Sequence, residues 1–350
     1  MIRSWTLRYR IVAVLTVILV AIAYRSRAQD ATANEQAIRV AIEKALPLLR
    51  KGSEGHMANR TCFACHNQAH VMVAMREAEN RGIAKVDPAF AEANANHTLK
   101  FLSRNTDAYK KGFGQGGQAD TAGYALWLLE VSNTKPDETT SAVVEYLIQY
   151  HSDWGYWRSS GNRPPSEASH FSTTYAAIRG LKAFSTDDQR LRANERIARA
   201  KKWLEETPAA DTEDAVFRLR SLTLVESETD VIAKAASELA ALQRADGGWA
   251  QTKELTSDAY ATGSAMTALA ETNLPITSQV SFRRGVEYLL RTQHDDGTWR
   301  VTTRSKPFQE YFETGFPHEK DQFISSAATS WAVAALSMSP QPISQNKPGK

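Results

Sequence analysis

The sequence predicts an all-α fold, an (α/α)6 toroid built from six helical hairpins. Two observations lead to this prediction. After Asp30, apolar residues recur at three-and-four spacing almost throughout the chain, which is the period of amphipathic helices. The expected helices also alternate between two kinds, because each helix with a polar outer face is followed by one that is apolar nearly all round, as buried helices are. This alternation, at a period of about 35 to 57 residues, favours a closed double ring over an open solenoid.

The outer helices are the first members of the hairpins. We place them at residues 35–50, 93–105, 139–150, 190–206, 229–243 and 279–293. The second members are rich in Ala with Leu, Tyr and Trp, so they should form the inner barrel. We place them at residues 62–80, 119–131, 171–184, 213–226, 258–271 and 325–338. The toroid is expected to span residues 34–340, and residues 341–350 are expected to form a disordered tail.

One motif recurs where two outer helices end. Residues 284–299 (RGVEYLLRTQHDDGTW) match in full the QW repeat K/R-G/A-x2-aromatic-L-x3-Q-x2-D/E-G-x-W. Residues 234–249 (KAASELAALQRADGGW) match it except that Glu238 stands at the aromatic position. In these motifs the chain resembles the terpenoid cyclase/prenyltransferase superfamily, the squalene/hopene cyclases in particular, whose fold is an α/α toroid. Because Asp-Gly suits a tight turn, we expect Gln and Trp to tie that turn to the next inner helix and to brace the fold rather than to catalyse.

The chain departs from the catalytic motifs that this resemblance implies. Class II cyclases carry D-x-D-D and class I terpene enzymes carry D-D-x-x-D, whereas the pairs Asp187-Asp188 and Asp295-Asp296 lack the further aspartates. The dispersed Asp, Cys and His set of the zinc-dependent prenyltransferases is not matched either, since both cysteines lie within residues 62–65. Function therefore has to be argued from the site and not from the fold.

The N-terminus predicts export. Residues 1–10 are basic, residues 11–23 form an uncharged apolar run, and Ser26 and Ala28 are small residues at the two positions that a signal peptidase reads. The run is shorter than the roughly 20 residues of a membrane-spanning helix. We therefore expect residues 1–28 to be a signal peptide and the protein to be periplasmic or secreted. In the alternative, a retained anchor, the protein reaches the membrane only through this segment.

The charge balance does not favour a nucleic-acid partner. The whole chain has a formal net charge of +3. Residues 1–28 hold five arginines and no acidic residue, so the remainder carries 3 − 5 = −2. A protein that binds nucleic acid through its phosphates needs a basic surface, which this composition does not indicate.

The two cysteines of the chain form a single motif. Residues 62–66 read CFACH, the C-x-x-C-H pattern at which c-type haem is attached. Cys62 and Cys65 would form thioethers from one helical turn, and His66 would be an axial ligand of the iron. Three alternatives remain: a disulfide between Cys62 and Cys65, zinc held by Cys62, Cys65 or His66, and His70, and unpaired thiols.

The loops that join outer to inner helices should meet at one mouth of the barrel, beside this motif. Two of them are long, residues 159–172 and 300–324, and long loops in compact repeats usually serve a site. Since the sixth hairpin closes the ring beside the first, we expect His318 to be the second axial ligand, ahead of His170. A five-coordinate iron is the alternative. Arg163 is expected to pair with a haem propionate.

Three functions remain open at this point. The first is an exported haem protein, in electron transfer or as a haem-dependent oxidoreductase, with an apolar small molecule in the barrel cavity and a redox partner. The second is a divergent terpenoid cyclase in which Asp120 or Asp258 is the acid, although aspartates at helix starts are more often caps. The third is a non-catalytic binding toroid with zinc or a disulfide at Cys62 and Cys65.

Overall fold

The computed structural model describes residues 34–272, 274, 277–307 and 309–340. The chain divides into two compact units. In the first unit the described residues are 34–40, which are helical, and residue 340. The second unit, residues 41–339, holds the helical hairpins. The predicted signal peptide at 1–28 and the predicted tail at 341–350 lie outside the described residues. Among the helices that are described, none is long and apolar enough to cross a membrane.

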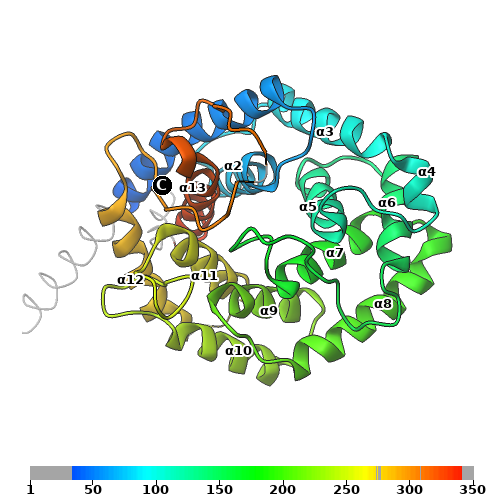
Figure 1. Cartoon of the computed structure of the whole chain (residues 1–350). Coiled ribbons are helices and arrows are strands. Elements are labelled where there is room, and N and C mark those ends of the chain that lie inside the picture. The colour runs from blue at the N-terminus through cyan, green and yellow to red at the C-terminus, as the bar shows by residue number, and fades with distance from the viewer. Residues whose placement is uncertain (1–33, 273, 275–276, 308, 341–350) are drawn as a thin grey trace, which may run out of the picture. The chain divides into compact units, whose positions relative to one another are not determined.

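The second unit is a double ring of helices (Figure 1). The outer helices are residues 41–59, α3 (Pro88–Ser103), α6 (Glu138–Gln149), α8 (Asp187–Glu206), α10 (Thr229–Ala241) and α12 (Thr277–Thr292). The inner helices are α2 (His70–Asn80), α5 (Gln118–Val131), α7 (His170–Phe184), α9 (Thr212–Leu224), α11 (Ala259–Glu271) and α13 (Gln322–Ser337). Each inner helix packs against the next, and α13 closes the ring against α2. The predicted all-α toroid of six hairpins is confirmed.

Side-chain caps explain where several helices begin. Asp137 accepts a hydrogen bond from the backbone N–H of Thr140 at 2.8 Å and forms a capping box at the start of α6. On the inner ring, Ser169, Asp211 and Asp258 accept backbone N–H groups at the starts of α7, α9 and α11. Each such cap stabilises a helix by about 1 kcal/mol. Asp258, considered above as an acid, therefore has a structural role.

The first hairpin differs from the prediction. Its outer helix continues to residue 59 rather than 50. Its inner helix begins at Cys65 with a π-helical turn, η1 (Cys65–Ala69), which continues directly into α2. Cys62 therefore lies in the preceding loop, and the expectation that both cysteines share one helical turn is wrong. A short additional helix, α4 (Thr106–Lys110), follows α3.

Three tryptophans that follow outer helices brace their hairpins in the same way. Trp299 Nε1–H donates to the Leu289 carbonyl at 2.9 Å, and its backbone N–H donates to the Thr329 hydroxyl on α13 at 3.1 Å. Trp157 and Trp249 make the same pair of bonds in their own hairpins. The indole thus holds the turn against its own outer helix, while the backbone holds it against the following inner helix, and the predicted bracing role is confirmed.

The glutamines of the motif join neighbouring outer helices, and not the next inner helix as we expected. Gln243 Nε2 donates to the Ser281 carbonyl of α12 at 2.8 Å. Gln293 Nε2 donates to the Ala41 carbonyl, also at 2.8 Å, so the sixth outer helix is tied to the first. Gly297 occupies the turn with φ 92°, a conformation that glycine adopts without steric cost.

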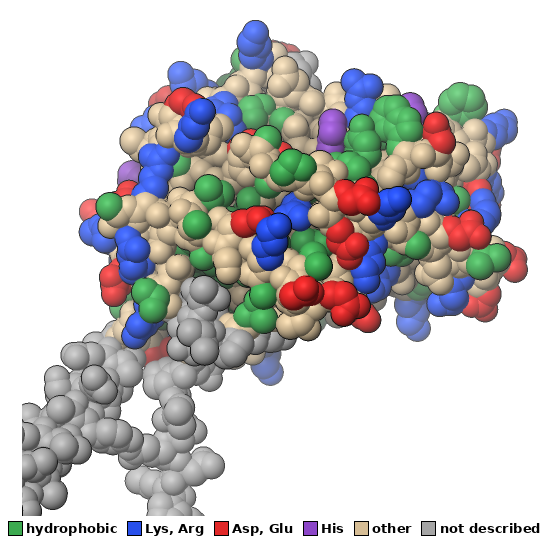
Figure 2. Space-filling view, turned by 90° about the horizontal axis from the view of Figure 1, so that it is seen from below, with side chains coloured by type: hydrophobic (Ala, Val, Ile, Leu, Met, Phe, Trp, Pro, Cys, Tyr) green, Lys and Arg blue, Asp and Glu red, His purple; other side chains and the backbone are tan. Residues whose placement is uncertain are grey.

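The exposed side of the outer helices carries charges of both signs. Figure 2 shows acidic and basic side chains interspersed on the side of the molecule that is lowest in Figure 1. Many of these charges lie close together in pairs, such as Arg192 with Glu145 at 2.7 Å and Arg190 with Asp187 at 2.6 Å. Exposed pairs of this kind contribute little to stability, so the stability of the fold depends on the inner ring.

The middle of the inner ring is filled by side chains. The Arg220 guanidinium lies 4.4 Å from the ring centre of Tyr175, 5.1 Å from that of Trp127 and 5.0 Å from that of Trp331. It also donates two hydrogen bonds of 2.8 Å to Glu271. Arg220 is 2% exposed, and Trp127 and Trp331 are 1% exposed, so these side chains are almost fully enclosed. At this level the inner ring is packed by aromatic and charged side chains.

Candidate functional site

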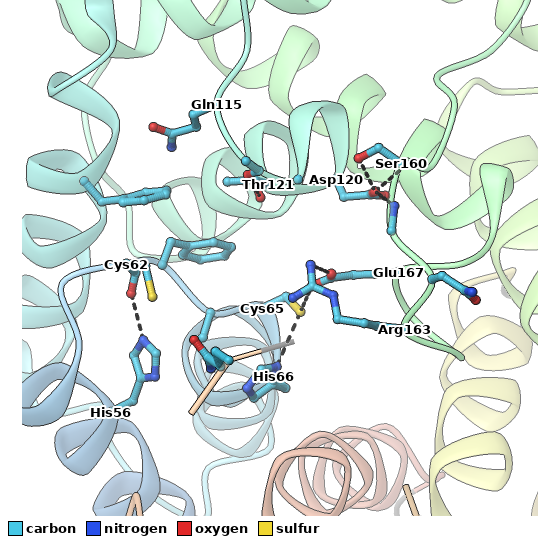
Figure 3. Close-up of a pocket in the computed structure, with 18 of the residues that line it drawn as sticks. His56, Cys62, Cys65, His66, Gln115, Asp120, Thr121, Ser160, Arg163 and Glu167 are labelled. Carbon is cyan, nitrogen blue, oxygen red and sulfur yellow. Dashed lines mark hydrogen bonds and ion pairs between the residues drawn. The ribbon is translucent and has the colours of Figure 1, made fainter. Parts of the chain in front are cut away.

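A pocket of about 680 Å³ opens at the mouth of the barrel (Figure 3). Its size is within the range of cofactor and ligand sites. Four of the six residues predicted to bind haem line it, namely Cys62, Cys65, His66 and Arg163. Other lining residues come from the start of α5 and from the two long loops: Gln115, Gly116, Gly117, Asp120, Thr121, Ser160, Gly161, Asn162, Glu167, Lys306, Pro307, Gln309 and Phe312.

The Cys65 thiol is held at the pocket wall by a carboxylate. Its sulfur is buried and donates a hydrogen bond to Oε1 of Glu167 at 3.0 Å. Glu167 also forms an ion pair with Arg163, four residues earlier in the same loop. Burial raises the pKa of the Cys65 thiol well above its usual value, and the adjacent Glu167 charge raises it further. The thiol is therefore protonated at neutral pH and has a fixed direction.

Cys62 is placed by a histidine from the outer helix. His56 Nε2 donates to the Cys62 carbonyl at 2.8 Å, which fixes the backbone of the loop before the π-helical turn. His56 is buried, and this burial lowers the pKa of its ring to about 4, so the ring is neutral at pH 7. The sulfur of Cys62 is half-buried and lines the pocket. Both cysteines are free thiols in this structure.

His66 lies where the first and sixth hairpins meet. Its ring packs edge-on against Phe323 of α13 with ring centres 5.1 Å apart, and its carbonyl accepts a hydrogen bond from Ser326 of the same helix at 3.3 Å. Burial lowers the pKa of the ring well below its usual value, so a nitrogen lone pair is available at neutral pH. A π-helical turn places it here, and such turns are frequent at functional sites.

The loop that carries Arg163 and Glu167 is anchored by Asp120 at the start of α5. Oδ2 of Asp120 accepts hydrogen bonds from the backbone N–H of Ser160 at 2.9 Å and of Gly161 at 3.3 Å. Figure 3 shows these bonds on the far side of the pocket from Cys62. Asp120 thus holds the backbone of this loop, and this role fits it better than that of a general acid.

A second pocket, of about 520 Å³, lies beside the first on the other side of this loop. Six residues line both pockets, whereas neither cysteine lines the second; the six are His66, Arg163, Glu167, Lys306, Pro307 and Gln309. The remaining wall of the second pocket comes from the 300–324 loop and the first turns of α13, including Tyr311, Lys320, Phe323, Ile324 and Ala327. The mouth therefore has a cysteine-lined pocket and a pocket without cysteines, with His66 between them.

His318, which we expected to be the second axial ligand, lines neither of the two pockets at the mouth. Its Nε2 is 2.7 Å from the Thr298 hydroxyl, and its ring is 5.5 Å from that of His294. The sixth hairpin does lie beside the first, as expected, but the short helix η2 (Glu319–Asp321) separates His318 from α13. Phe323, on α13 itself, is the side chain that reaches His66.

His170 is also directed away from the pocket. Its ring stacks on Tyr156 with centres 5.2 Å apart, and its Nδ1 accepts the backbone N–H of Ser159 at 3.1 Å. Neither pocket at the mouth is lined by it. Of the predicted haem-binding residues, the structure thus brings four together and separates His170 and His318 from them.

The described residues differ in how well they suit the candidate cofactors. For haem, the pocket offers two thiols, an imidazole, the cations Arg163 and Lys306 and the aromatic ring of Phe312. For zinc, the described chain holds no cluster of three or more His, Cys, Asp or Glu side chains placed to bind a metal ion. His70 packs instead against Trp331 with ring centres 5.1 Å apart. The pocket thus holds the donor types that a c-type haem uses, and the described residues show no group placed to bind zinc.

Comparison with known proteins supports the fold. Residues 211–339 match the model of the squalene-hopene cyclase C-terminal domain. The structure is similar to the type II terpene cyclase MstE from Scytonema, with a TM-score of 0.55, 14% identity, and 87% of this chain and 98% of that chain covered. The fold is a cyclase-like α/α toroid. It is also similar to a glycosidase, with a TM-score of 0.59, 12% identity, and the same coverage of 87% and 98%.

A third similar structure is longer than this toroid. It is ent-copalyl diphosphate synthase from Streptomyces platensis, with a TM-score of 0.52 and 18% identity over 77% of this chain. The toroid spans about half of that chain, 50%. No curated protein matches the sequence. At these identities the similarities establish the fold alone.

Sequence reasoning missed the residues that position the two thiols. These residues are His56 and Glu167, and they were missed because the bonds from His56 to the Cys62 carbonyl and from the Cys65 thiol to Glu167 have no signal in the sequence. Glu167 is 102 residues from Cys65 in the chain, so only the closed ring brings the two together.

Proposed function

We propose that this protein is an exported haem protein whose haem is attached covalently in the cysteine-lined pocket, and that it works in electron transfer or as a haem-dependent oxidoreductase. One observation carries the proposal: the two cysteines of the chain and the adjacent His66 line a single pocket of about 680 Å³. The predicted signal peptide supports export, because C-x-x-C-H attaches haem in extracytoplasmic compartments.

The residues of the pocket have separate roles in this proposal. Cys62 and Cys65 would hold the haem through thioether bonds to its two vinyl groups. Glu167 holds the Cys65 sulfur in place, and His56 holds the backbone of Cys62. Arg163 and Lys306 provide cations for propionates. Bound haem would supply one-electron chemistry at its iron, and neutral His66 would be its protein ligand.

A second candidate is a cyclase-like enzyme that takes an apolar substrate. The match of residues 211–339 to a cyclase domain favours it, as does the similarity to a structure of MstE with geranylgeranyl dihydroxybenzoate as substrate, which has 13% identity. In this chain Glu167 would be the acid, since burial raises its pKa and it faces the pocket. Arg220 and its aromatic neighbours fill the space that a substrate would need in the middle of the barrel.

The test of the haem proposal is production of the full chain in a bacterial host that has c-type haem maturation. We expect a Soret band that survives denaturation and a haem-stained band on a denaturing gel. The double variant Cys62→Ala with Cys65→Ala should lose both signals and remain helical by circular dichroism. The matched control, Thr121→Ala, changes another residue that lines the same pocket and should keep both.

Two results would overturn the haem proposal. One is a colourless wild-type protein from a host that matures a control cytochrome c. The other is full haem staining in the double cysteine variant. If the wild-type protein is colourless and converts an apolar polyene, with activity lost in Glu167→Gln, the second candidate is supported instead.

A further inference from the structure

The second pocket at the mouth has its own chemistry. It has a volume of about 520 Å³ and is formed by residues 163–167, by the loop after residue 302 and by the first turns of α13. Because neither cysteine lines it, it is not the place where a thioether would hold haem. Its size lies within the range of small-molecule sites.

The charged side chains that line this pocket carry an excess of positive charge. Arg163, Lys306 and Lys320 line it, against the two carboxylates Glu167 and Glu310. Arg163 is paired with Glu167. Within the described part of the chain, Lys306 and Lys320 have no hydrogen bond or ion pair from their side chains, and both are exposed. The start of the sixteen-residue helix α13 lies at the same pocket, and the N-terminal end of a helix favours an anion.

Other residues that line this pocket are apolar. Phe323 and Ile324 are half-buried in the first turn of α13, and Ala327 and Pro164 also line the pocket. Half-buried apolar side chains in a concave site gain stability when a ligand removes them from water, by about 25 cal/mol per Å² of apolar surface. A ligand that suits both the charged and the apolar side chains must have an anionic end and an apolar body.

We propose that this pocket binds a small amphipathic anion, an aromatic or short alkyl carboxylate, with its acid group between Lys306 and Lys320 and its apolar part on Phe323 and Ile324. The inference does not rest on the proposed function, because it uses no cysteine and no haem. It goes beyond that function by placing a ligand next to His66, where it would be the neighbour of any group bound in the cysteine-lined pocket.

The experiment is calorimetric titration of the full chain with 2-naphthoate, and with the neutral 2-naphthamide as the matched probe. The protein carries Cys62→Ala and Cys65→Ala, so that haem does not affect the outcome. We expect 2-naphthoate to bind with at least tenfold higher affinity than the amide. The change Lys306→Glu with Lys320→Glu should weaken binding of the acid at least tenfold and leave binding of the amide unchanged.

Two further variants keep the inference testable. Phe323→Ala should weaken both probes to a similar extent, since it removes apolar contact and no charge. Lys253→Glu, at an exposed lysine outside this pocket, is the control for net charge and should leave both affinities unchanged. The proposal is overturned if acid and amide bind equally or if neither binds. It is also overturned if Lys253→Glu and the double lysine variant lose the same affinity. None of these results bears on haem attachment.

Discussion

The middle and the mouth of the inner ring are built from different kinds of side chains. In the middle, Arg220 is enclosed by Trp127, Tyr175 and Trp331 and paired with Glu271. At the mouth, the loops leave two pockets lined by thiols, carboxylates, cations and a histidine. The same six hairpins therefore provide a closed core at one level and an open site at another. The candidate functional site of this toroid therefore lies at its mouth.

The largest effect is expected from Arg220→Ala. This change leaves Glu271 without its partner and removes a guanidinium that contacts four aromatic rings. Breaking a buried ion pair costs about 3–5 kcal/mol, and the lost cation–π contacts place this variant at the upper end, at about 5 kcal/mol. Chemical denaturation measures the loss. Arg190→Ala, at an exposed ion pair, is the control and should change stability by less than about 0.5 kcal/mol.

A loss of only about 0.5 kcal/mol in Arg220→Ala would show that the middle of the barrel is not a packed core. In that case the comparison between the two levels fails, and a substrate cavity in the barrel becomes the better interpretation. A large loss in both arginine variants would point to a general effect of removing charge.

Trp299→Ala tests the brace between hairpins. Trp299 is 1% exposed, and its indole and backbone both donate hydrogen bonds. We expect a loss of about 3–5 kcal/mol, typical of Trp→Ala in a core, measured as a lower denaturation midpoint. Phe312→Ala at the mouth, where the ring is half-buried, should cost clearly less. Equal losses at the two positions would contradict the distinction between a packed core and an open mouth.

The helical architecture was predictable because each hairpin carries its own signals. The alternation of amphipathic and apolar helices predicted all six helical hairpins, and the QW motifs at 234–249 and 284–299 indicated where their turns lie. The partners of Gln243 and Gln293 were not predictable, since the neighbouring outer helix is brought to them only by ring closure. The π-helical turn at Cys65–Ala69 had no signal in the apolar pattern.

The site was predictable where sequence neighbours form it and unpredictable where distant loops meet. Cys62, Cys65 and His66 are adjacent in the chain and line one pocket. The choice of His318 rested on ring closure alone, which places the sixth hairpin correctly but does not say which residue of a long loop turns inward. Helix α13 begins four residues after His318, and Phe323 on that helix contacts His66.

The burial of His70 in the inner ring should make the stability of the protein depend on pH. Burial lowers the pKa of its ring to about 3, and neither ring nitrogen has a hydrogen-bond partner among the described residues. The unfolded chain takes up a proton on His70 as the pH falls through about 6.5, whereas the folded chain does so only near pH 3, so acid favours unfolding. At pH 5 this difference amounts to about 2 kcal/mol.

The variant His70→Leu should therefore lose less stability than the wild-type protein between pH 7.5 and pH 5, by about 2 kcal/mol, in paired denaturation curves. His294→Leu changes an exposed histidine near the rim and is the control, which should keep the wild-type acid sensitivity. An unchanged pH dependence in His70→Leu would mean that this ring is accessible to water in the folded state.

The smallest effect, none at all, is expected from His318→Ala on the visible spectrum of the haem-loaded protein. The structure places His318 against Thr298 and away from both pockets. His66→Ala should change the spectrum, since His66 is the proposed iron ligand. If His318→Ala converts a low-spin spectrum to a high-spin one, the mouth must rearrange when haem is attached, and the position of His318 described above is not that of the loaded protein.

Haem attachment at the mouth can be measured by intact mass spectrometry of the purified chain, matured in a host with c-type haem machinery. We expect a protein heavier by the mass of one haem, with the added mass on the peptide that contains Cys62 and Cys65. Arg220→Ala should carry the same added mass in the fraction that folds, because the mouth and the middle are separate. Haem is not attached to this chain if the wild-type protein shows no added mass in cells that fully load a control cytochrome c.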